Sequence, residues 1–265
     1  MSIYVMSDIH GEADLFHAML EQINFSESDT LYILGDVIDR GPDGIALLQE
    51  IRKTPNMIML MGSHEYMMLR HYEPKHAELD LWNAYRYGNK RTVSDFCNLR
   101  AEEQHDIIEF LKDLPGHILI NVEGIAYYLV HGFPGETMEN EVRFRPRLHE
   151  MNPVENTRLI IGHTPVLNLM APKEEQQEFI SLLARRGERP RILFAEGFID
   201  IDCGCSYAEP MKTLGCLRLN DLAEYYTYHK QNIIDLTKRG KLHPLKTSDK
   251  NTLYLKSEIL KRNWQ

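Results

Sequence analysis

Carboxylate and imidazole side chains recur in five short stretches of this chain, and together they could bind metal ions. The stretches are SDIHG with Asp8 and His10, GDVIDRGPDG with Asp36, Asp39 and Arg40, GSHE with His64, VHG with His131, and IGHTP with His163. Mixed carboxylate and imidazole ligands suit Mn, Fe or Zn better than Mg or Ca. The candidates are too many for one tetrahedral ion, whereas two ions about 3.5–4 Å apart, bridged by a carboxylate, would use them. Such a pair lowers the pKa of a bridging water and holds the oxygens of a displacement at phosphorus.

Taken singly, these stretches have ordinary structural explanations. Asp before Gly is a common choice in turns, and GHTP alone is compatible with a simple strand exit. The stretch GDVIDRGPDG is harder to explain, because it puts dense charge directly after an apolar segment. Burying unpaired charge costs several kcal/mol, so a partner ion is implied. The five stretches together favour a functional site.

Each stretch follows a segment with the pattern of a buried strand. Strand patterns in residues 2–7, 30–35 and 56–61 alternate with helical patterns in 12–25 and 43–54, which predicts parallel strands joined by right-handed crossovers. Residues 65–115 are expected to be largely helical. Further strands are predicted in 117–132, 157–165, 191–204 and 213–229, several of them in hairpins, and a surface helix in 174–188. Ligands of α/β sheets bind outside the carboxyl ends of strands, so these strand ends would bring the polar residues together.

The overall composition restricts the class of protein. The chain has 265 residues, of which 43% are hydrophobic, enough for a substantial core. Its net charge of -9 argues against nonspecific binding to nucleic acid or to an anionic membrane. The apolar runs are far shorter than the roughly 18 residues of a membrane span, and the N-terminus lacks the basic region of a signal peptide. A cytoplasmic protein is expected.

The ordered motifs D-x-H-G, G-D-x-x-D-R-G, G-x-H-E, H-G and G-H-T-P resemble those of the calcineurin-like metallophosphoesterases. More narrowly, they are similar to the PPP-type serine/threonine protein phosphatases in their short bacterial and phage form. The motifs extend from residue 8 to residue 163, and the later IDIDCG and GCLRLND are also similar. The resemblance implies an α+β or α/β fold of four layers, a central β-sandwich of mixed sheets flanked by helices. It implies a catalytic domain in residues 1–237, and residues 238–265 would be a C-terminal extension of unassigned role.

The resemblance also implies a role for each motif residue. Two divalent ions are expected, with Mn²⁺ favoured and Fe or Zn as alternatives. The expected metal ligands are Asp8 and His10 for the first ion, Asp36 as the bridge, and His131 and His163 with position 63 for the second ion. His64 would protonate the leaving group, Asp39 would orient His64, and Arg40 would bind the phosphate. A second phosphate-binding arginine is expected before GHTP, and Arg145 is preferred to Arg143 and Arg147. Glu65 is expected to support the following helix rather than to act in catalysis.

The chain departs from the family pattern at Ser63, where Asn is usual and supplies an amide oxygen to the second metal. A serine hydroxyl reaches less far and is a poorer ligand, so weaker binding of the second metal is expected. Met61 also stands where arginine is frequent, which removes one phosphate contact. Ser63 is compatible with natural variation completed by a water, with a weakened or regulatory pseudophosphatase, and with an engineered change.

Three functions are compatible with these residues. The first is hydrolysis of phosphoserine and phosphothreonine, and of phosphotyrosine, in protein substrates by a metal-bridging hydroxide. The second is hydrolysis of dinucleoside polyphosphates or other small phosphates, and the third is phosphate binding by a catalytically impaired relative. The aromatic residues Trp82, Tyr85, Tyr87 and Phe96 could stack on a base, although their helical spacing favours core packing. The sequence does not set the oligomeric state.

Overall fold

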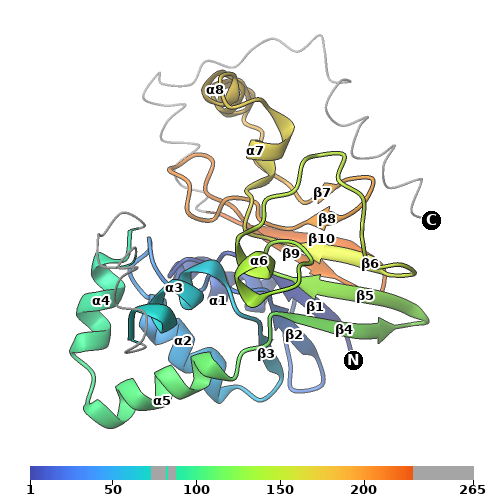
Figure 1. Ribbon diagram of the computed structural model, residues 1–265. Helices are drawn as coiled ribbons and strands as arrows, with labels where there is room; N and C mark the ends of the chain where they lie inside the picture. Colours follow the sequence, from blue (N-terminus) through green and yellow to red (C-terminus); the bar gives the residue numbers. More distant parts are fainter. Residues whose placement is uncertain (73–81, 83–87, 229–265) are drawn as a thin grey trace.

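Two five-stranded sheets form the centre of the molecule, with helices on both outer sides (Figure 1). The structure, a computed structural model, describes residues 1–72, Trp82 and residues 88–228. The strands are β1 (Ile3–Met6), β2 (Thr30–Ile33), β3 (Met57–Met59), β4 (His117–Val122), β5 (Ile125–Val130), β6 (Arg158–Ile161), β7 (Leu193–Phe194), β8 (Ile199–Asp200), β9 (Leu214–Arg218) and β10 (Ala223–Thr227). The helices are α1 (Ala13–Gln22), α2 (Gly44–Lys53), α3 (Ser63–Tyr72), α4 (Lys90–Cys97), α5 (Ala101–Lys112), α6 (Met138–Arg143), α7 (Val166–Met170) and α8 (Gln176–Arg186).

The first sheet has the strand order β10-β9-β1-β2-β3. Strands β1, β2 and β3 are parallel, as the alternation of strand and helix patterns predicts, and α1 and α2 connect them. Strands β9 and β10 form an antiparallel hairpin whose first strand pairs with β1. The carboxyl ends of β1, β2 and β3 therefore lie along one edge of this sheet.

The second sheet has the strand order β4-β5-β6-β8-β7. Strands β4 and β5 form the predicted antiparallel hairpin, which turns at Glu123 and Gly124. Strands β6 and β8 extend it in parallel with β5, and β7 pairs antiparallel with β8. Both sheets are thus mixed, and the ends of β5, β6 and β8 share an edge in the second sheet.

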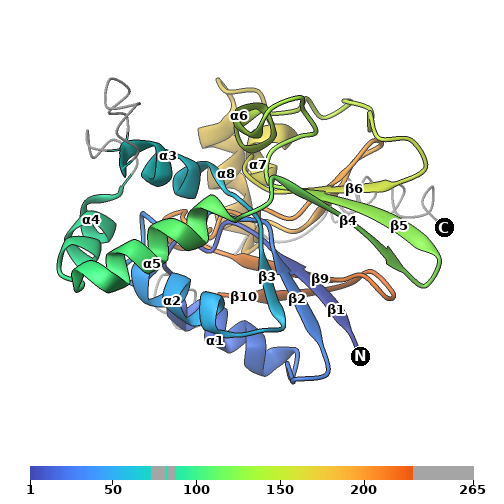
Figure 2. The ribbon, with the colours of Figure 1, turned by 60° about the horizontal axis from the view of Figure 1, so that its bottom comes forward.

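The alternation of side chains along each strand divides the apolar residues between two kinds of layer. Val5 of β1 and Leu129 of β5 belong to the core between the sheets. Met6 of β1 belongs to a separate core with side chains of α1 and α2, whereas Val130 of β5 faces the opposite outer side. Figure 2 shows α1, α2 and α5 on the outer side of the first sheet and α6 and α7 on that of the second. The predicted β-sandwich of mixed sheets flanked by helices is confirmed.

The predicted helical section, residues 65–115, forms α3, α4 and α5 in its described part. Helix α3 begins at Ser63, so His64 and Glu65 lie in its first turn rather than before it. The predicted C-terminal extension, residues 238–265, lies outside the described residues, as does the end of the predicted catalytic domain. Among the helices that the structure describes, none is long and apolar enough to cross a membrane.

Candidate active site

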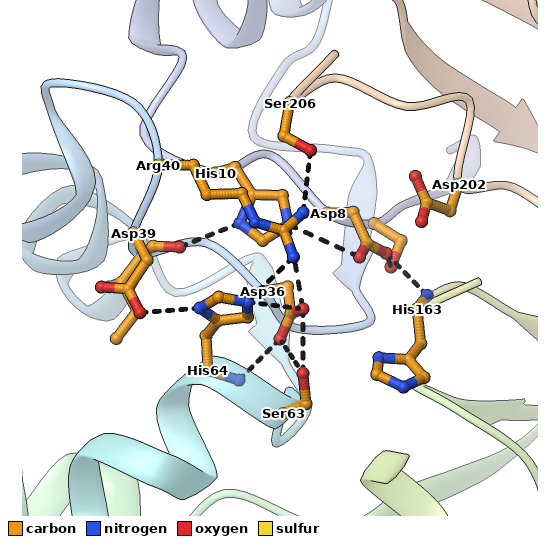
Figure 3. Close-up of polar contacts among 12 residues, drawn as sticks. Asp8, His10, Asp36, Asp39, Arg40, Ser63, His64, His163, Asp202 and Ser206 are labelled. Atoms are coloured by element: carbon orange, nitrogen blue, oxygen red, sulfur yellow. Dashed lines mark hydrogen bonds and ion pairs between the residues drawn. The ribbon is translucent and has the colours of Figure 1, made fainter. Parts of the chain in front are cut away.

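The loops that leave the strand ends of both sheets bring the predicted residues into one cluster, most of which Figure 3 shows. Asp8 and His10 follow β1, Asp36, Asp39 and Arg40 follow β2, His64 begins α3, and His131 and His163 follow β5 and β6. Apart from Arg40, which is exposed, each of these side chains is buried. Titratable groups are seldom buried unless they have partners, so the cluster needs a chemical explanation.

The backbone of this cluster is held in an unusual conformation. The residues with φ between 49° and 69° include Asp8, His10, Asp36, Asp39, Arg40 and His163. This left-handed region costs residues other than glycine about 1–3 kcal/mol each, and it persists where the surroundings enforce it. Here the enforcing contacts are backbone hydrogen bonds between neighbouring loops: the N–H of Asp8 donates to Gly35 O at 3.1 Å, and that of His10 to Asp36 O at 2.9 Å. The strain aims several side chains at a common point.

Asp36 lies at the centre of the cluster. Its Oδ1 is 3.3 Å from His131 Nε2, and its Oδ2 is 3.9 Å from His10 Nε2. It belongs to two groups of side chains whose ligand atoms lie within 4.8 Å of one another, one with His131 and His163 and one with His10 and His64. A carboxylate shared by two such groups is the arrangement that a bridging ligand requires.

Buried nitrogen atoms test whether metal ions fit this cluster. His10 Nδ1 lies 3.1 Å from the carbonyl oxygen of Ile38, which leaves its buried Nε2 without a hydrogen-bond partner among the described residues. His131 Nδ1 has no hydrogen-bond partner in the same described set, and His131 Nε2 faces the Asp36 carboxylate at 3.3 Å. Orphaned buried nitrogens beside carboxylates are what metal ions would satisfy, and a backbone contact on the other nitrogen is typical of a metal-binding histidine.

Asp8, rather than His64, is the better partner of His10 and Asp36 in the first metal group. The Oδ2 atom of Asp8 accepts hydrogen bonds from Ser7 Oγ at 2.5 Å and from the backbone N–H of His163 at 2.9 Å. Its Oδ1 lies 3.8 Å from His10 Nε2 and remains directed at the cluster. His64, in contrast, uses both ring nitrogens in other contacts. The donor set fits the ligands expected from the sequence.

The electrostatics of the cluster also favour a bound cation. Burial raises the pKa of Asp8; the imidazole of His131 counteracts this effect, and the Asp36 carboxylate adds to it. Burial opposes the charge of Asp36 as well, but His131 and His64 hold the pKa of Asp36 well below its usual range. Burial raises the pKa of Asp202 well above its usual range, and Asp8 raises it further. Crowded buried carboxylates are stabilised by positive charge.

The surroundings of two of the imidazoles favour the neutral form that binds metal ions. Burial, together with the charge of Arg40, lowers the pKa of His10 well below its usual range. Burial, His131 and Arg145 lower the pKa of His163 to about 2. His131 behaves differently: burial works against its charge, yet the Asp36 carboxylate raises the pKa of His131 to about 9. A divalent ion is the alternative positive partner for Asp36 at this place.

His64 and Asp39 form a buried pair at one side of the cluster. His64 Nδ1 lies 2.7 Å from Asp39 Oδ2, while His64 Nε2 lies 3.2 Å from Arg40 Nη2 (Figure 3). The Nη1 atom of Arg40 donates to Ser206 Oγ at 2.8 Å. Burial would lower the pKa of His64, but Asp36 and Asp39 outweigh it and raise that pKa. The arrangement presents an imidazole and a guanidinium side by side.

Ser63 lies in the cluster, but its contact is with a carboxylate. Its hydroxyl donates to Asp36, with Oγ 3.1 Å from Oδ2 and 3.3 Å from Oδ1. The preceding Gly62 has no room for a side chain, because a Cβ there would lie 2.1 Å from the backbone nitrogen of Asp36. The start of α3 therefore presses directly against the Asp36 loop, and position 63 is next to the predicted second metal.

Ser63→Asn is expected to strengthen metal binding, because an amide oxygen is a better ligand for a divalent ion than a hydroxyl. We expect the more weakly bound ion to bind about tenfold more tightly, which is the size of effect that residues around a metal site have on affinity. Turnover should also be faster. Titration of the metal-free protein with Mn²⁺, together with phosphatase rates, measures both quantities. Equal affinity and equal rates in the two proteins would show that Ser63 does not weaken the site.

Glu65 has a different structural role from the expected support of its helix. Its Oε1 accepts the backbone N–H groups of Val37 and Ile38 at 2.9 and 3.1 Å, and its Oε2 accepts that of Asp36 at 2.8 Å. The expectation from sequence was wrong about the partner, because the three donors are far away in the chain and meet Glu65 only after folding. Glu65 fixes the loop that carries the central carboxylate.

Glu65→Gln is expected to lower the free energy of unfolding. The amide would present an N–H₂ group to one of three backbone donors, and a buried donor left without an acceptor costs about 1–3 kcal/mol. Urea denaturation measures the loss, and Glu109→Gln is the matched control because its side chain lies at the surface, where it bonds to Lys112 at 2.7 Å and lies 4.0 Å from His105. Equal stability of the two variants would contradict the role assigned to Glu65.

Arg145 lies beside the predicted second metal site. Its Nη1 atom donates to the carbonyl oxygen of His163 at 2.9 Å, and the side chain is exposed. Arg143 instead pairs with Glu139 on the surface of α6 at 3.2 Å. The structure thus places the preferred arginine at the cluster, and its role in phosphate binding stays a prediction.

Two residues near the cluster, Asp200 and Asp202, had no site role in the sequence interpretation, and Trp82 was considered only for stacking on a base. Asp200 and Asp202 are buried at the end of β8, and the Oδ2 atom of Asp200 has no hydrogen-bond partner among the described residues. The recurrent signal, an acidic residue after a strand, was present in IDIDCG. Trp82 is 1% exposed, and its indole N–H donates to Asp39 Oδ2 at 3.0 Å. Trp82 and Phe96 are core residues, whereas Tyr85 and Tyr87 lie outside the described residues.

Comparison with known proteins gives one family and several relatives. Residues 1–197 match the family described as calcineurin-like phosphoesterase. A symmetrical bis(5'-nucleosyl)-tetraphosphatase of Acidovorax ebreus is 26% identical over 223 residues, which are 79% of this chain and 73% of that protein. Serine/threonine-protein phosphatase 2 of Escherichia coli is 33% identical over 139 residues, which are 50% of this chain and 59% of that protein.

The fold has counterparts among solved structures. A crystal structure of a metallophosphoesterase from Sphaerobacter thermophilus aligns with a TM-score of 0.52 and 17% sequence identity. The alignment covers 92% of this chain and 95% of that chain. At this identity the similarity shows a common fold and leaves the substrate open.

Proposed function

Because this chain belongs to the calcineurin-like phosphoesterase family, we propose that it is a hydrolase of phosphate monoesters in proteins. Phosphoserine and phosphothreonine would be its main substrates, with phosphotyrosine as a further one. The relative from Escherichia coli, a serine/threonine-protein phosphatase, supports this substrate class. A cytoplasmic location suits such substrates.

The residues of the cluster suit two divalent ions, which we propose to be Mn²⁺ because carboxylate and imidazole ligands are mixed. Asp8 and His10 would hold one ion, His131 and His163 the other, and Asp36 both. When bound, the ions would supply Lewis-acid charge to the phosphate and activate water as the nucleophile. The family uses divalent metals, and Fe and Zn suit the same ligands.

The protein's own side chains would bind the phosphate and deliver a proton. The exposed guanidinium of Arg40 has the fork that matches two phosphate oxygens, with Arg145 as a second contact. Asp39 holds the Nδ1 atom of His64, which turns Nε2 toward the site. A phosphate that draws the N–H groups of Arg40 away from Nε2 would leave that atom free to carry a proton to the leaving oxygen.

The observation that carries this proposal is the buried His64–Asp39 pair beside Arg40. General acid catalysis matters most when the leaving group is strongly basic, as the alkoxide of serine or threonine is. A phosphoanhydride releases a phosphate instead, which is much less basic and depends less on a proton donor. The geometry therefore favours a phosphomonoester.

Hydrolysis of dinucleoside polyphosphates is the second candidate. It is favoured by the relative from Acidovorax ebreus, whose alignment covers 79% of this chain. Two of the aromatic side chains considered for stacking on a base, Trp82 and Phe96, are buried in a core with 1% and 2% exposure. They are not available for such stacking in this arrangement.

Initial rates with Mn²⁺ on three substrates would test the proposal: a phosphothreonine peptide, p-nitrophenyl phosphate and diadenosine tetraphosphate. We expect the highest kcat/KM on the phosphopeptide. A higher value on diadenosine tetraphosphate would overturn the first proposal in favour of the second. Hydrolysis of none of the three would contradict both and favour a protein that only binds phosphate.

A further inference from the structure

The buried indole of Trp82 meets the carboxylate that orients the proposed general acid. Its Nε1–H donates to Asp39 Oδ2 at 3.0 Å, and the same oxygen contacts His64 Nδ1 at 2.7 Å. The indole nitrogen can only donate, so the contact requires the carboxylate as acceptor. Trp82 therefore reaches His64 through one shared oxygen atom.

Few other groups restrain this carboxylate. The Oδ1 atom of Asp39 is buried and has no hydrogen-bond partner among the described residues. The backbone N–H of Asp39 donates to Thr92 Oγ1 at 3.1 Å, which fixes the main chain but not the rotation of the carboxylate. Within the described part of the chain, the indole is thus the restraint on this carboxylate besides the imidazole itself.

Trp82 contacts residues at the start of α4 and at the end of α3. The amide of Asn89, at the start of α4, donates to the carbonyl oxygen of Trp82. The rings of His71 and Tyr72, at the end of α3, lie 5.5 and 6.0 Å from the indole ring. The first turn of α3 carries His64, the proposed proton donor, and the last turn of the same helix packs against Trp82.

We propose that Trp82 is a positioning residue, whose indole N–H fixes the Asp39 carboxylate and thereby holds His64 ready to protonate the leaving group. This inference rests on the proposed function, since it assigns Trp82 an effect only through His64. The indole contact would act through orientation. It would keep the imidazole of His64 in the position that proton transfer needs, and misplacement of reacting atoms lowers the rate. Trp82 touches no substrate in this account.

Trp82→Phe tests the proposal, because it keeps an aromatic ring and removes the N–H donor. We expect kcat on phenyl phosphate to fall about three- to tenfold, the size of the effect of losing one ordinary net hydrogen bond. On 2,4-dinitrophenyl phosphate, whose leaving group needs no proton, we expect a change of less than about twofold. KM for each substrate and the content of bound Mn²⁺ should be the same in Trp82→Phe as in the unmodified protein.

Phe96→Leu is the matched control. Phe96 is buried in the same aromatic cluster, with its ring 4.9 Å from that of Tyr72, and it has no hydrogen-bonding group to offer Asp39. Any loss in this variant should be equal on the two substrates. In an Asp39→Ala background, Trp82→Phe should produce no further loss on phenyl phosphate, because the carboxylate that accepts the indole N–H is absent.

The results distinguish failure of the positioning role of Trp82 from failure of the proposed function. If Trp82→Phe loses the same factor on both substrates, or loses nothing, the positioning role is wrong even though the proposed function stands. If His64→Ala shows no dependence on the leaving group, the proposed function fails instead. Should Trp82→Phe not fold, site-specific replacement by benzothienylalanine, in which sulfur replaces the N–H at nearly unchanged volume, gives the same comparison.

Discussion

Asp36→Asn is expected to abolish the binding of metal ions and, with it, hydrolysis. The carboxylate lies between His10 and His131 and belongs to both groups of candidate ligands. An amide has one oxygen and no charge, so it cannot bridge two cations. Loss of a contact outside the ligand shell lowers metal affinity about 10–100-fold, so loss of the bridge should exceed a hundredfold. Metal content after dialysis and the rate on p-nitrophenyl phosphate measure the two effects.

Asp29→Asn is the matched control for this variant. Asp29 is also a buried carboxylate, 9% exposed, but its oxygens accept hydrogen bonds from Ser2 and Ser26 away from the cluster. The control should lose stability while keeping its ions and its activity. Retention of both ions by Asp36→Asn would contradict the assignment of this residue as the bridge.

His64→Ala is the prediction with the second largest effect. It removes the proposed proton donor and leaves the residues assigned to metal binding in place. General acid catalysis contributes about 10²–10⁴-fold, so we expect kcat on phenyl phosphate to fall by about that factor. Metal content and KM should change little. Steady-state kinetics with the metal-loaded protein, together with metal analysis, provide the measurement.

The surface variant His17→Ala is a suitable control for His64→Ala. Its imidazole is half exposed and bonds to Glu50 on the next helix, so activity should be retained. The comparison also decides whether the chain is an impaired relative that only binds phosphate. Hydrolysis by the unmodified protein that disappears in His64→Ala excludes that interpretation, and a residual rate equal in both proteins would support it.

The arrangement of strands could be predicted because the physical signal is local. Alternating strand and helix patterns in residues 2–61 require parallel strands, and the short turn at Glu123 and Gly124 requires an antiparallel hairpin. Since polar residues that follow parallel strands meet at one edge, the proximity of Asp8 and Asp36 follows from the same pattern. Periodicity and turn chemistry were sufficient for this much of the fold.

The contacts that support the site could not be predicted, because each joins segments that are distant in sequence. Glu65 binds three backbone donors of the Asp36 loop, which no pattern around Glu65 indicates. The aromatic residues around Trp82 have helical spacing. That spacing predicts that Trp82 is a core residue, but it does not indicate which polar group its indole N–H contacts. Hydrogen bonds of this kind form only in the tertiary structure, and local sequence patterns do not identify partners that are distant in the chain.

The left-handed backbone of the candidate site has a consequence for protein engineering. Asp8, Asp36 and His163 occupy conformations that glycine adopts with little strain, and asparagine tolerates them better than most residues. A library selected only for thermal tolerance should therefore enrich such replacements at these positions, and the enriched clones should be inactive. Selection for heat resistance alone would select against the chemistry, so a useful screen of this scaffold has to demand turnover in every round.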